Sequence, residues 1–125
     1  MALDFSQQIS RPYVNRTSNG FEQVSIAYAA NQPFHFSCRF KANWDGADDK
    51  YFMSLQNGDT DGNVFNYGIY NNRLLQYNGL YDTGTLTFYN VVRKLDLAYF
   101  GGVLKVYLDS QLVNTRSVSI GAANY

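Results

Sequence analysis

Apolar and polar side chains alternate most regularly near the C-terminal end of the chain. One alternating run ends at Phe100, a second begins at Leu104, and Gly101-Gly102 stands between them. Alternation is the pattern of a strand with one buried face, and two glycines can both adopt the positive φ that a two-residue primed turn requires. The stretch therefore predicts a hairpin. Asp109-Ser110-Gln111 predicts a second turn, and residues 112–115 predict a third short strand.

The same alternation recurs along the rest of the chain, and its clearest example is residues 34–41. There the pattern places Cys38 on one face with three phenylalanines and His35 on the other face. Further strands are predicted at residues 3–5, 12–14, 21–27, 51–56, 64–70, 73–77, 85–89 and 116–120. Turn-forming residues separate these segments, and Asn71-Asn72 predicts another two-residue turn. About ten short strands at this spacing are typical of an all-β fold, an antiparallel β-sandwich or jelly roll. We expect it to form a single domain over residues 1–125.

The composition favours strands over helices and gives the chain no strong electrostatic field. Aromatic residues make up 17% of the 125 residues, whereas Glu22 is the only glutamate. Ten Lys and Arg balance ten Asp and Glu, so we expect neither a nucleic-acid partner nor a membrane partner. The N-terminus lacks the basic and apolar regions of a secretory signal, and no segment approaches the ~20 apolar residues of a membrane span. Because Cys38 is the only cysteine, we expect a chain made and folded in the reducing cytosol.

Four segments, taken in order, resemble one known family. They are residues 2–5 with Tyr13-Val14, residues 34–41 (FHFSCRFK), residues 66–74 (NYGIYNNRL), and residues 97–109 (LAYFGGVLKVYLD) with 112–114. Together they resemble the laminin-G-like, concanavalin-A-like jelly roll. The chain departs from that family at Arg93-Lys94-Leu95, where the family usually carries Trp-His-His. The resemblance implies ligand recognition, often of glycans, and catalysis only in some members.

The residues capable of catalysis do not form a catalytic pattern. Glycosidases of the family that the chain resembles use two carboxylates on one strand, which flank the scissile bond. No predicted strand carries Asp at positions i and i+2, and the pair with that spacing, Asp59 and Asp61, falls in a glycine-flanked loop. His35 and Cys38 fall on opposite faces of one strand, which excludes a Cys-His nucleophile pair. The sequence therefore predicts a protein that is not an enzyme, with a half-exposed histidine and an inert buried thiol.

One loop carries oxygen ligands at alternate positions, as in the first half of a calcium-binding loop. These ligands are Asn57, Asp59 and Asp61. Gly68 stands where such a loop has its bidentate glutamate, although three aspartates in residues 45–49 could add carboxylates. We therefore expect no required cofactor, and two interpretations of the loop stay open, a Ca²⁺ site and a solvated acidic turn.

Aromatic side chains at the predicted turns give the strongest functional signal. Amide and carboxylate side chains accompany them, and the candidate ligand-binding set is Trp44, Asn66, Tyr70, Tyr77, Asn78, Tyr81 and Asp82. Rings beside such acceptors can hold a sugar, because an apolar sugar face stacks on the ring while the hydroxyls form hydrogen bonds. Two other interpretations stay open. Tyrosines can complete the outer faces of sheets, and the same residue types are enriched in protein interfaces.

Two functions fit these features. The first is a non-catalytic, lectin-like surface module of a virus or phage particle, a capsid decoration or fibre subunit that serves attachment or stabilisation. We favour it because a recognition domain made in the cytosol without an export signal meets the outside when it is carried on a particle released by lysis. The second is a free-standing carbohydrate-binding lectin. The expected partners are a glycan, a virion or capsid protein, or both, and further copies of the chain; the expected location is the virion surface.

Overall fold

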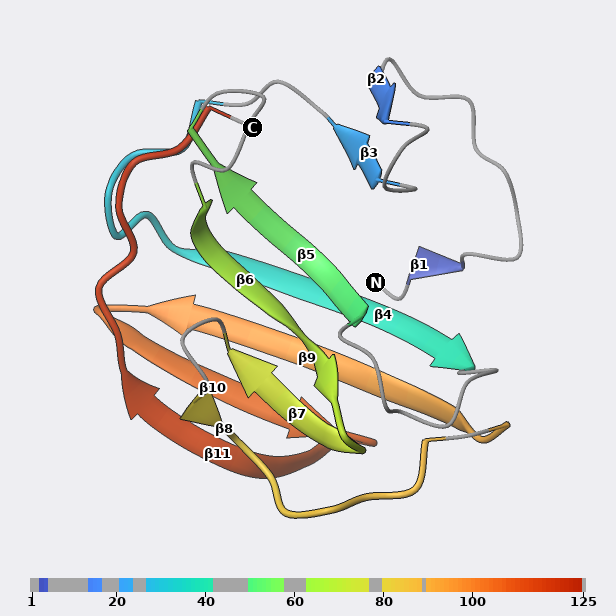
Figure 1. The fold of residues 1–125 in the computed structure, drawn as a ribbon. Helices are drawn as coiled ribbons and strands as arrows, with labels where there is room; N and C mark the ends of the chain where they lie inside the picture. Colours follow the sequence, from blue (N-terminus) through green and yellow to red (C-terminus); the bar gives the residue numbers. More distant parts are fainter. Residues whose placement is uncertain are drawn as a thin grey trace.

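The computed structural model of the protein describes residues 3–4, 14–16, 21–23, 27–41, 50–57, 63–76, 80–88 and 90–124. Across these residues the chain forms strands, turns and irregular connections but no helix, and so none long and apolar enough to cross a membrane. The strands assemble into two larger sheets and one separate pair (Figure 1). The described part of the chain is therefore all-β, as the sequence predicts.

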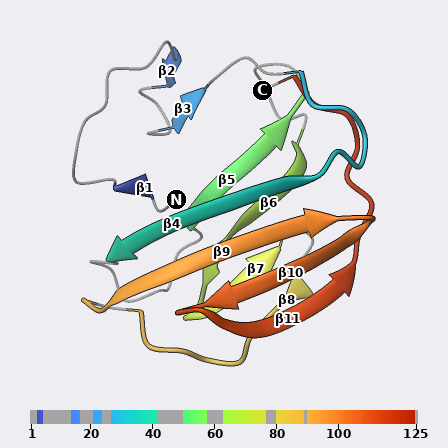
Figure 2. The ribbon, with the colours of Figure 1, turned by 180° about the vertical axis from the view of Figure 1, so that it is seen from behind.

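The first sheet contains the predicted hairpin and the most regular predicted strand. In spatial order its strands are β1 (Leu3–Asp4), β4 (Phe34–Lys41), β9 (Val92–Phe100), β10 (Val103–Leu108) and β11 (Gln111–Ser117). The last four pair antiparallel, whereas β1 pairs parallel to β4 at the sheet edge. Figure 2 shows this sheet from its outer side. Because β4 pairs with β9, the chain leaves the sheet after Lys41, builds the second sheet, and returns at Val92.

The second sheet is formed by the residues between these two strands. In spatial order its strands are β5 (Lys50–Gln56), β6 (Asn63–Tyr70), β7 (Arg73–Gln76) and β8 (Leu80–Tyr81), and each neighbouring pair is antiparallel. β2 (Val14–Arg16) and β3 (Phe21–Gln23) form the separate antiparallel pair. The order of the second sheet follows the sequence, so short turns suffice to connect its strands.

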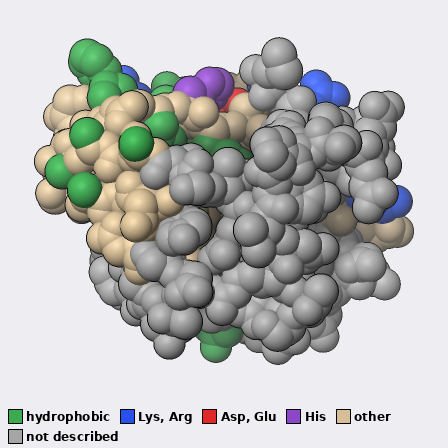
Figure 3. Space-filling view, turned by 90° about the horizontal axis from the view of Figure 1, so that it is seen from above, with side chains coloured by type: hydrophobic (Ala, Val, Ile, Leu, Met, Phe, Trp, Pro, Cys, Tyr) green, Lys and Arg blue, Asp and Glu red, His purple; other side chains and the backbone are tan. Residues whose placement is uncertain are grey.

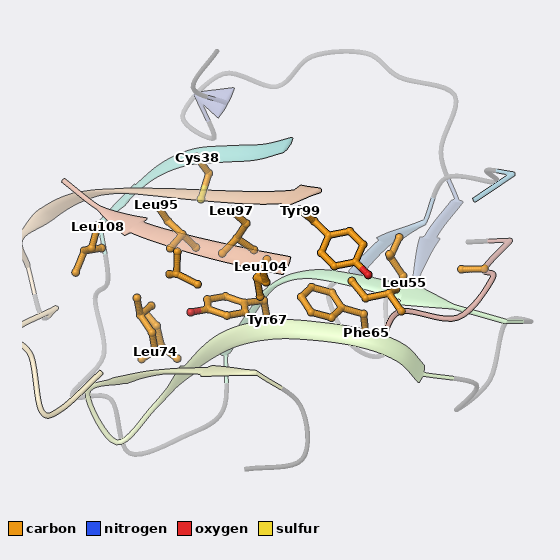
Figure 4. Close-up of a cluster of buried hydrophobic side chains, with 14 of the residues drawn as sticks. Cys38, Leu55, Phe65, Tyr67, Leu74, Leu95, Leu97, Tyr99, Leu104 and Leu108 are labelled. Carbon is orange, nitrogen blue, oxygen red and sulfur yellow. The ribbon is translucent and has the colours of Figure 1, made fainter. Parts of the chain in front are cut away.

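The two larger sheets face one another across a shared hydrophobic core (Figure 4). Its largest fully buried side chains come from both sheets and include Phe65, Tyr67, Ile69, Leu74, Leu95, Leu97, Tyr99, Leu104, Val106 and Cys38. The rings of Phe34 and Phe65 meet edge-on with 5.9 Å between centroids, and those of Phe40 and Phe52 lie 4.6 Å apart. Both contacts join strands of opposite sheets, so the described chain has a sandwich-like arrangement of two packed layers.

Three two-residue turns of the described chain place both of their residues at positive φ. The φ values are 60° and 76° at Gly101 and Gly102, 48° and 57° at Asn71 and Asn72, and 51° and 69° at Asp109 and Ser110. These are values of primed turns, whose twist matches that of the strands they connect. The turns predicted at Gly101-Gly102 and Asn71-Asn72 are confirmed. The third turn consists of Asp109 and Ser110, and Gln111 already belongs to β11.

β2 covers Val14–Arg16, whereas the sequence predicts a strand at 12–14. Three segments after β7 also differ from the sequence prediction. Residues 85–88 form no strand, because the backbone N–H of Leu86 donates to the carbonyl of Asn72 at the β6–β7 turn instead of to a neighbouring strand. The strands predicted at residues 112–115 and 116–120 are one strand, because pairing with β10 continues without interruption through Thr115 and Arg116; this strand ends at Ser117 and carries a bulge at Val113. Leu80 and Tyr81, predicted to lie in a loop, form β8.

Candidate functional site

An open hollow of about 550 Å³ lies at the tip of the β9–β10 hairpin. Segments distant in sequence meet there, and the lining residues are Asn31, Gly101, Gly102, Ser117, Val118 and Ser119. Asn31 precedes β4, the two glycines form the hairpin turn, and the other three lie at and just after the end of β11. In Figure 2 this is the end of the sheet where β9 ends and β10 begins. The hollow therefore depends on the assembled sheet and not on a single loop.

Asn31 holds these segments together. Its φ is 57°, a left-handed conformation that asparagine tolerates. Its Oδ1 accepts a hydrogen bond from the backbone N–H of Ile120 at 2.9 Å, and the hydroxyl of Tyr99 lies 2.8 Å from this oxygen and 2.8 Å from the carbonyl of Val118. The backbone N–H of Val118 in turn donates to the carbonyl of Gly102 at 3.0 Å. These bonds join the walls of the hollow, so the hollow is preformed.

Phe100 does not line the hollow itself, but it lies in the same cross-strand row as the lining residue Ser117, with Val103 between them, and it is largely in solvent. It is the last residue of β9, directly before the two lining glycines, and 77% of it is exposed. Its neighbour Tyr99 is buried, so the alternation of β9 turns Phe100 toward the outer side of the sheet. Leaving such a ring in water forgoes about 2 kcal/mol of hydrophobic stabilisation. The hairpin thus displays an apolar ring that a ligand can cover.

The hollow offers hydrogen-bonding groups next to this ring. Asn31, Ser117 and Ser119 contribute amide and hydroxyl groups, and the glycines leave the backbone uncovered. A Cβ atom placed on Gly101 or Gly102 would meet nothing within 4 Å, so the space beside the turn is open. An apolar surface with a few convergent polar groups is the arrangement of a small-ligand site. These groups can form hydrogen bonds and apolar contacts with a ligand.

Asp82, which the sequence analysis places among ligand-binding residues, is buried between the sheets. Its side chain has no exposed surface, and its Oδ2 accepts a hydrogen bond from the hydroxyl of Tyr67 at 2.5 Å. Its Oδ1 forms an ion pair with Arg116 and accepts a hydrogen bond from Nδ2 of Asn114. Nη1 of Arg116 also donates to Oε1 of Gln76 at 3.3 Å. Burial raises the pKa of Tyr67 and lowers that of Arg116, because each charged form loses hydration. The Asp82 carboxylate therefore has internal partners that tie β11 to the second sheet.

The other predicted ligand-binding residues fall in different places. Asn66 and Tyr70 lie on the outer side of β6, where Oδ1 of Asn66 accepts a hydrogen bond from the hydroxyl of Ser54 at 2.5 Å. Asn66 is buried and Tyr70 is half-buried. Tyr81 belongs to β8, and Trp44, Tyr77 and Asn78 lie outside the described residues. The structure thus brings Asn66 and Tyr70 to one face and places Asp82 in the interior.

The predicted calcium ligands lie only in part within the described chain. Asn57 is exposed directly after β5, whereas Asp59 and Asp61 lie outside the described residues. Within the described ranges, no group of three or more His, Cys, Asp or Glu side chains is arranged to hold a metal ion. The Ca²⁺ site at Asn57, Asp59 and Asp61 therefore stays a prediction from the sequence.

His35 and Cys38 lie on opposite faces of β4, as the alternation predicts. Cys38 is fully buried, and burial, followed by the negative charge of Asp96, raises the pKa of its thiol to about 12. The side chain of His35 is 57% exposed, with Nε2 3.3 Å from Oδ1 of Asp96, whose Oδ2 lies 3.3 Å from Nζ of Lys94. Figure 3 shows the histidine at the surface with acidic atoms beside it. Partial burial would raise the pKa of Asp96, but contacts with Ser37, Lys94 and His35 outweigh it and lower this pKa.

Asn31 and Phe100 were not selected by the sequence analysis. Phe100 does carry a signal, because it is a large apolar residue at a polar position of an alternating strand, next to a turn. Asn31 carries none, since its partners Tyr99 and Ile120 are 68 and 89 residues away in the chain. The convergence of these residues becomes visible only in the folded sheet.

Comparisons of the chain with protein-family models, with curated proteins and with solved structures found no match.

Proposed function

We propose that the chain is a non-catalytic, lectin-like recognition module, built as an antiparallel jelly-roll sandwich of about ten short strands. One observation carries this proposal. The exposed ring of Phe100 stands at the end of β9, next to the turn that lines a preformed hollow of amide, hydroxyl and backbone groups. This arrangement suits a glycan, because an apolar sugar face can stack on the ring while sugar hydroxyls bond to the polar groups. Ligand recognition is also what the laminin-G-like resemblance implies.

The reactive side chains of the described chain support a binding role. Cys38 is fully buried and its thiol has a raised pKa, so the thiolate that a nucleophile requires does not form near neutral pH. Asp82 is bonded to Tyr67 and Arg116 inside the core. His35 faces the opposite side of β4 from Cys38 and pairs with Asp96. None of these three residues lines the hollow, and Asp82 and His35 are each in contact with other side chains of the protein.

The setting that we propose is the surface of a virus or phage particle, as a capsid decoration or fibre subunit. At about 3.3 Å per residue, the ends of β9 are separated by about 26 Å. Phe100 stands at one end, whereas Val92, 64% exposed, stands at the other. The exposed Leu112 pairs with Tyr107 of β10, which is opposite Asp96 midway along β9. Exposed apolar side chains away from the hollow allow another part of the module to rest on a carrier while this end meets a ligand.

A free-standing carbohydrate-binding lectin is the alternative, since the hollow serves it equally well. The two settings differ in what Val92 and Leu112 do. Assembly of the protein into oligomers or onto capsids, lost in a Val92→Ser, Leu112→Ser double variant, supports the particle-bound module. A monomer in which this double variant leaves every measured property except stability unchanged supports the free lectin.

The experiment that tests the recognition role is a glycan array on the purified protein, run with Ca²⁺ and again with EDTA. We expect binding to a narrow class of sugars, and a loss of about tenfold or more in affinity in Phe100→Ala, the equivalent of about 1.4 kcal/mol. Leu112→Ala is the matched control, because it removes an exposed apolar side chain of the same sheet that does not line the hollow. Equal binding by wild type and Phe100→Ala, or an array without any signal, would contradict the proposal.

A further inference from the structure

The described residues that line the hollow carry no charge. Asn31, Ser117 and Ser119 are neutral polar residues, and the rest of the lining consists of two glycines and a valine. A carboxylated or sulfated sugar entering this space would lose part of the hydration of its charge without gaining an opposite charge. An uncharged sugar loses only the hydration of hydroxyl groups, which neutral donors and acceptors can replace.

The nearby cation of the outer face does not belong to this lining. Lys105 lies on β10 opposite Ala98 and is exposed, but the hollow is not lined by it. The Asp96 carboxylate, four residues before Phe100 on β9, is already in contact with His35 and Lys94. None of these charged groups lines the hollow, although Lys105 lies on the same outer face of the sheet as Phe100.

The hydrogen-bonding groups of the lining that stay available to a ligand are suited to binding hydroxyl groups. Oδ1 of Asn31 is occupied by Tyr99 and Ile120, which leaves the Nδ2 amide group as a donor on the lining. The hydroxyl of Ser117 is exposed and makes no hydrogen bond within the described chain, so it can donate or accept. A sugar hydroxyl can accept a hydrogen bond from the Asn31 amide group, and it can either donate to or accept from the Ser117 hydroxyl.

The size of the hollow limits the ligand. Its volume of about 550 Å³ falls within the ~300–1,000 Å³ typical of small-molecule sites, and one side is open to solvent. One or two sugar rings fit such a space, and one face of a ring can lie against Phe100. A longer chain would continue into solvent through the open side.

We infer that the hollow binds an uncharged pyranose, one or two rings long, that stacks on Phe100 without a divalent cation and without an ion pair. The inference rests on the proposed lectin-like function and names the class of its ligand. It separates this site from the acidic loop at Asp59 and Asp61, which lies outside the described residues and would require Ca²⁺.

The test compares neutral hexoses, N-acetylhexosamines and their disaccharides with hexuronic acid and sulfated counterparts of the same linkage, by titration calorimetry. We expect neutral sugars to bind at least about tenfold more tightly than their charged counterparts, because the lining cannot replace the hydration of a charge. Excess EDTA and a change from low to high salt should leave the neutral-sugar affinity within about twofold.

Charge introduced into the hollow provides a sharper comparison. Ser117→Lys adds a cation to the lining, whereas Thr115→Lys adds the same charge on the same strand outside the lining. We expect Ser117→Lys to raise hexuronate affinity relative to neutral sugar by about tenfold, and Thr115→Lys to leave the ratio unchanged. Ser119→Lys repeats the test at a second lining position if the first variant does not fold. Lys105→Met should leave the neutral-sugar affinity unchanged.

The outcomes separate this inference from the broader proposal. A wild-type preference for charged sugars, loss of binding in EDTA, or equal effects of Ser117→Lys and Thr115→Lys would each overturn the uncharged, metal-independent site while leaving a lectin in place. If no sugar of any class binds, both the inference and the lectin-like function are wrong. Neutral-sugar binding that is lost in Phe100→Ala and unaffected by EDTA supports both.

Discussion

Replacement of Asp82 by asparagine should be among the most destabilising single changes in the described chain. The carboxylate has no exposed surface, and it is bonded to Tyr67, Asn114 and Arg116. Asparagine preserves its shape but removes the charge opposite Arg116, whose side chain is only 16% exposed. Breaking one half of a buried ion pair costs about 3–5 kcal/mol, because the remaining charge stays buried without compensation. Because Arg116 retains some solvent contact, we expect a loss near the lower end, about 3 kcal/mol.

This loss is a large share of the total stability. A domain of this length has a free energy of unfolding of about 6–19 kcal/mol. We expect the midpoint of urea unfolding, followed by far-UV circular dichroism, to fall markedly, and Tm to fall by about 10–15 °C. Tyr67→Phe, which removes one hydrogen bond to the carboxylate, should cost about 2 kcal/mol. Lys94→Met is the control, because it breaks an ion pair near the surface that contributes less than about 1 kcal/mol.

A double-mutant cycle tests the physical cause. In Asp82→Asn with Arg116→Met neither buried charge remains, so the double variant should be more stable than the sum of the single losses predicts, by at least about 2 kcal/mol. Additive losses in the cycle, or a cost of Asp82→Asn below about 1 kcal/mol, would refute the reasoning. Such results would mean that Arg116 reaches solvent easily and that the pair does not hold the sheets together.

Two further predictions concern the turns and the buried thiol. Ser110 has a φ of 69°, which glycine adopts more easily, so Ser110→Gly should raise the free energy of unfolding by about 0.5–1 kcal/mol. Gly101 has a φ of 60° and open space around it, so Gly101→Ala should lower the free energy of unfolding by about 1 kcal/mol through backbone strain alone. Gly84→Ala, at a glycine without positive φ and with equal space, is the control and should change the same urea-derived value little; equal effects at the two glycines would contradict the argument. The folded-state pKa of Cys38, about 12, lies above the ordinary value of 9.0, so the folded protein holds this proton more tightly than the unfolded chain. The contribution of this thiol to the free energy of unfolding is complete below pH 9 and declines as the pH rises toward 12. Cys38→Ala should therefore flatten the decline of the free energy of unfolding in this pH range. If the slope is the same in the variant, the thiol is not the source of the decline.

Much of the fold could be predicted from the sequence, because each strand of a two-layer protein has one solvent-exposed face and one buried face, and polar and apolar residues therefore alternate along it. In β4 the alternation alone separated the buried Cys38 from the exposed His35. The Gly101-Gly102 and Asn71-Asn72 turns were predictable because few residues tolerate two successive positive φ values. The strand predicted at residues 85–89 is wrong over the described residues 85–88, because alternation does not say which partner the backbone will bond, and the N–H of Leu86 bonds to a turn.

The candidate site was far less predictable. Single polar residues have no period, so nothing in the sequence connects Asn31 with Ser119 or Ile120, which lie 88 and 89 residues away. Asp82 illustrates the opposite difficulty. Its sequence neighbours are turn-forming residues that suggest a solvent-exposed loop, yet Arg116, 34 positions later, draws the carboxylate into the core. Pairing over such distances is decided by the packing of the two sheets.

The buried ion pair and the hollow are connected through β11. Arg116 and Ser117 are consecutive, and the alternation of the strand turns the first into the core and the second toward the hollow. A slip of one residue in the pairing of β11 with β10 would exchange the two sides, exposing Arg116 and removing Ser117 from the lining. Since an arginine without Asp82 is costly to bury, the ion pair penalises that slipped register strongly. We therefore expect the pair to specify the register of β11, and the geometry of the ligand-binding end to follow from a contact made inside the core.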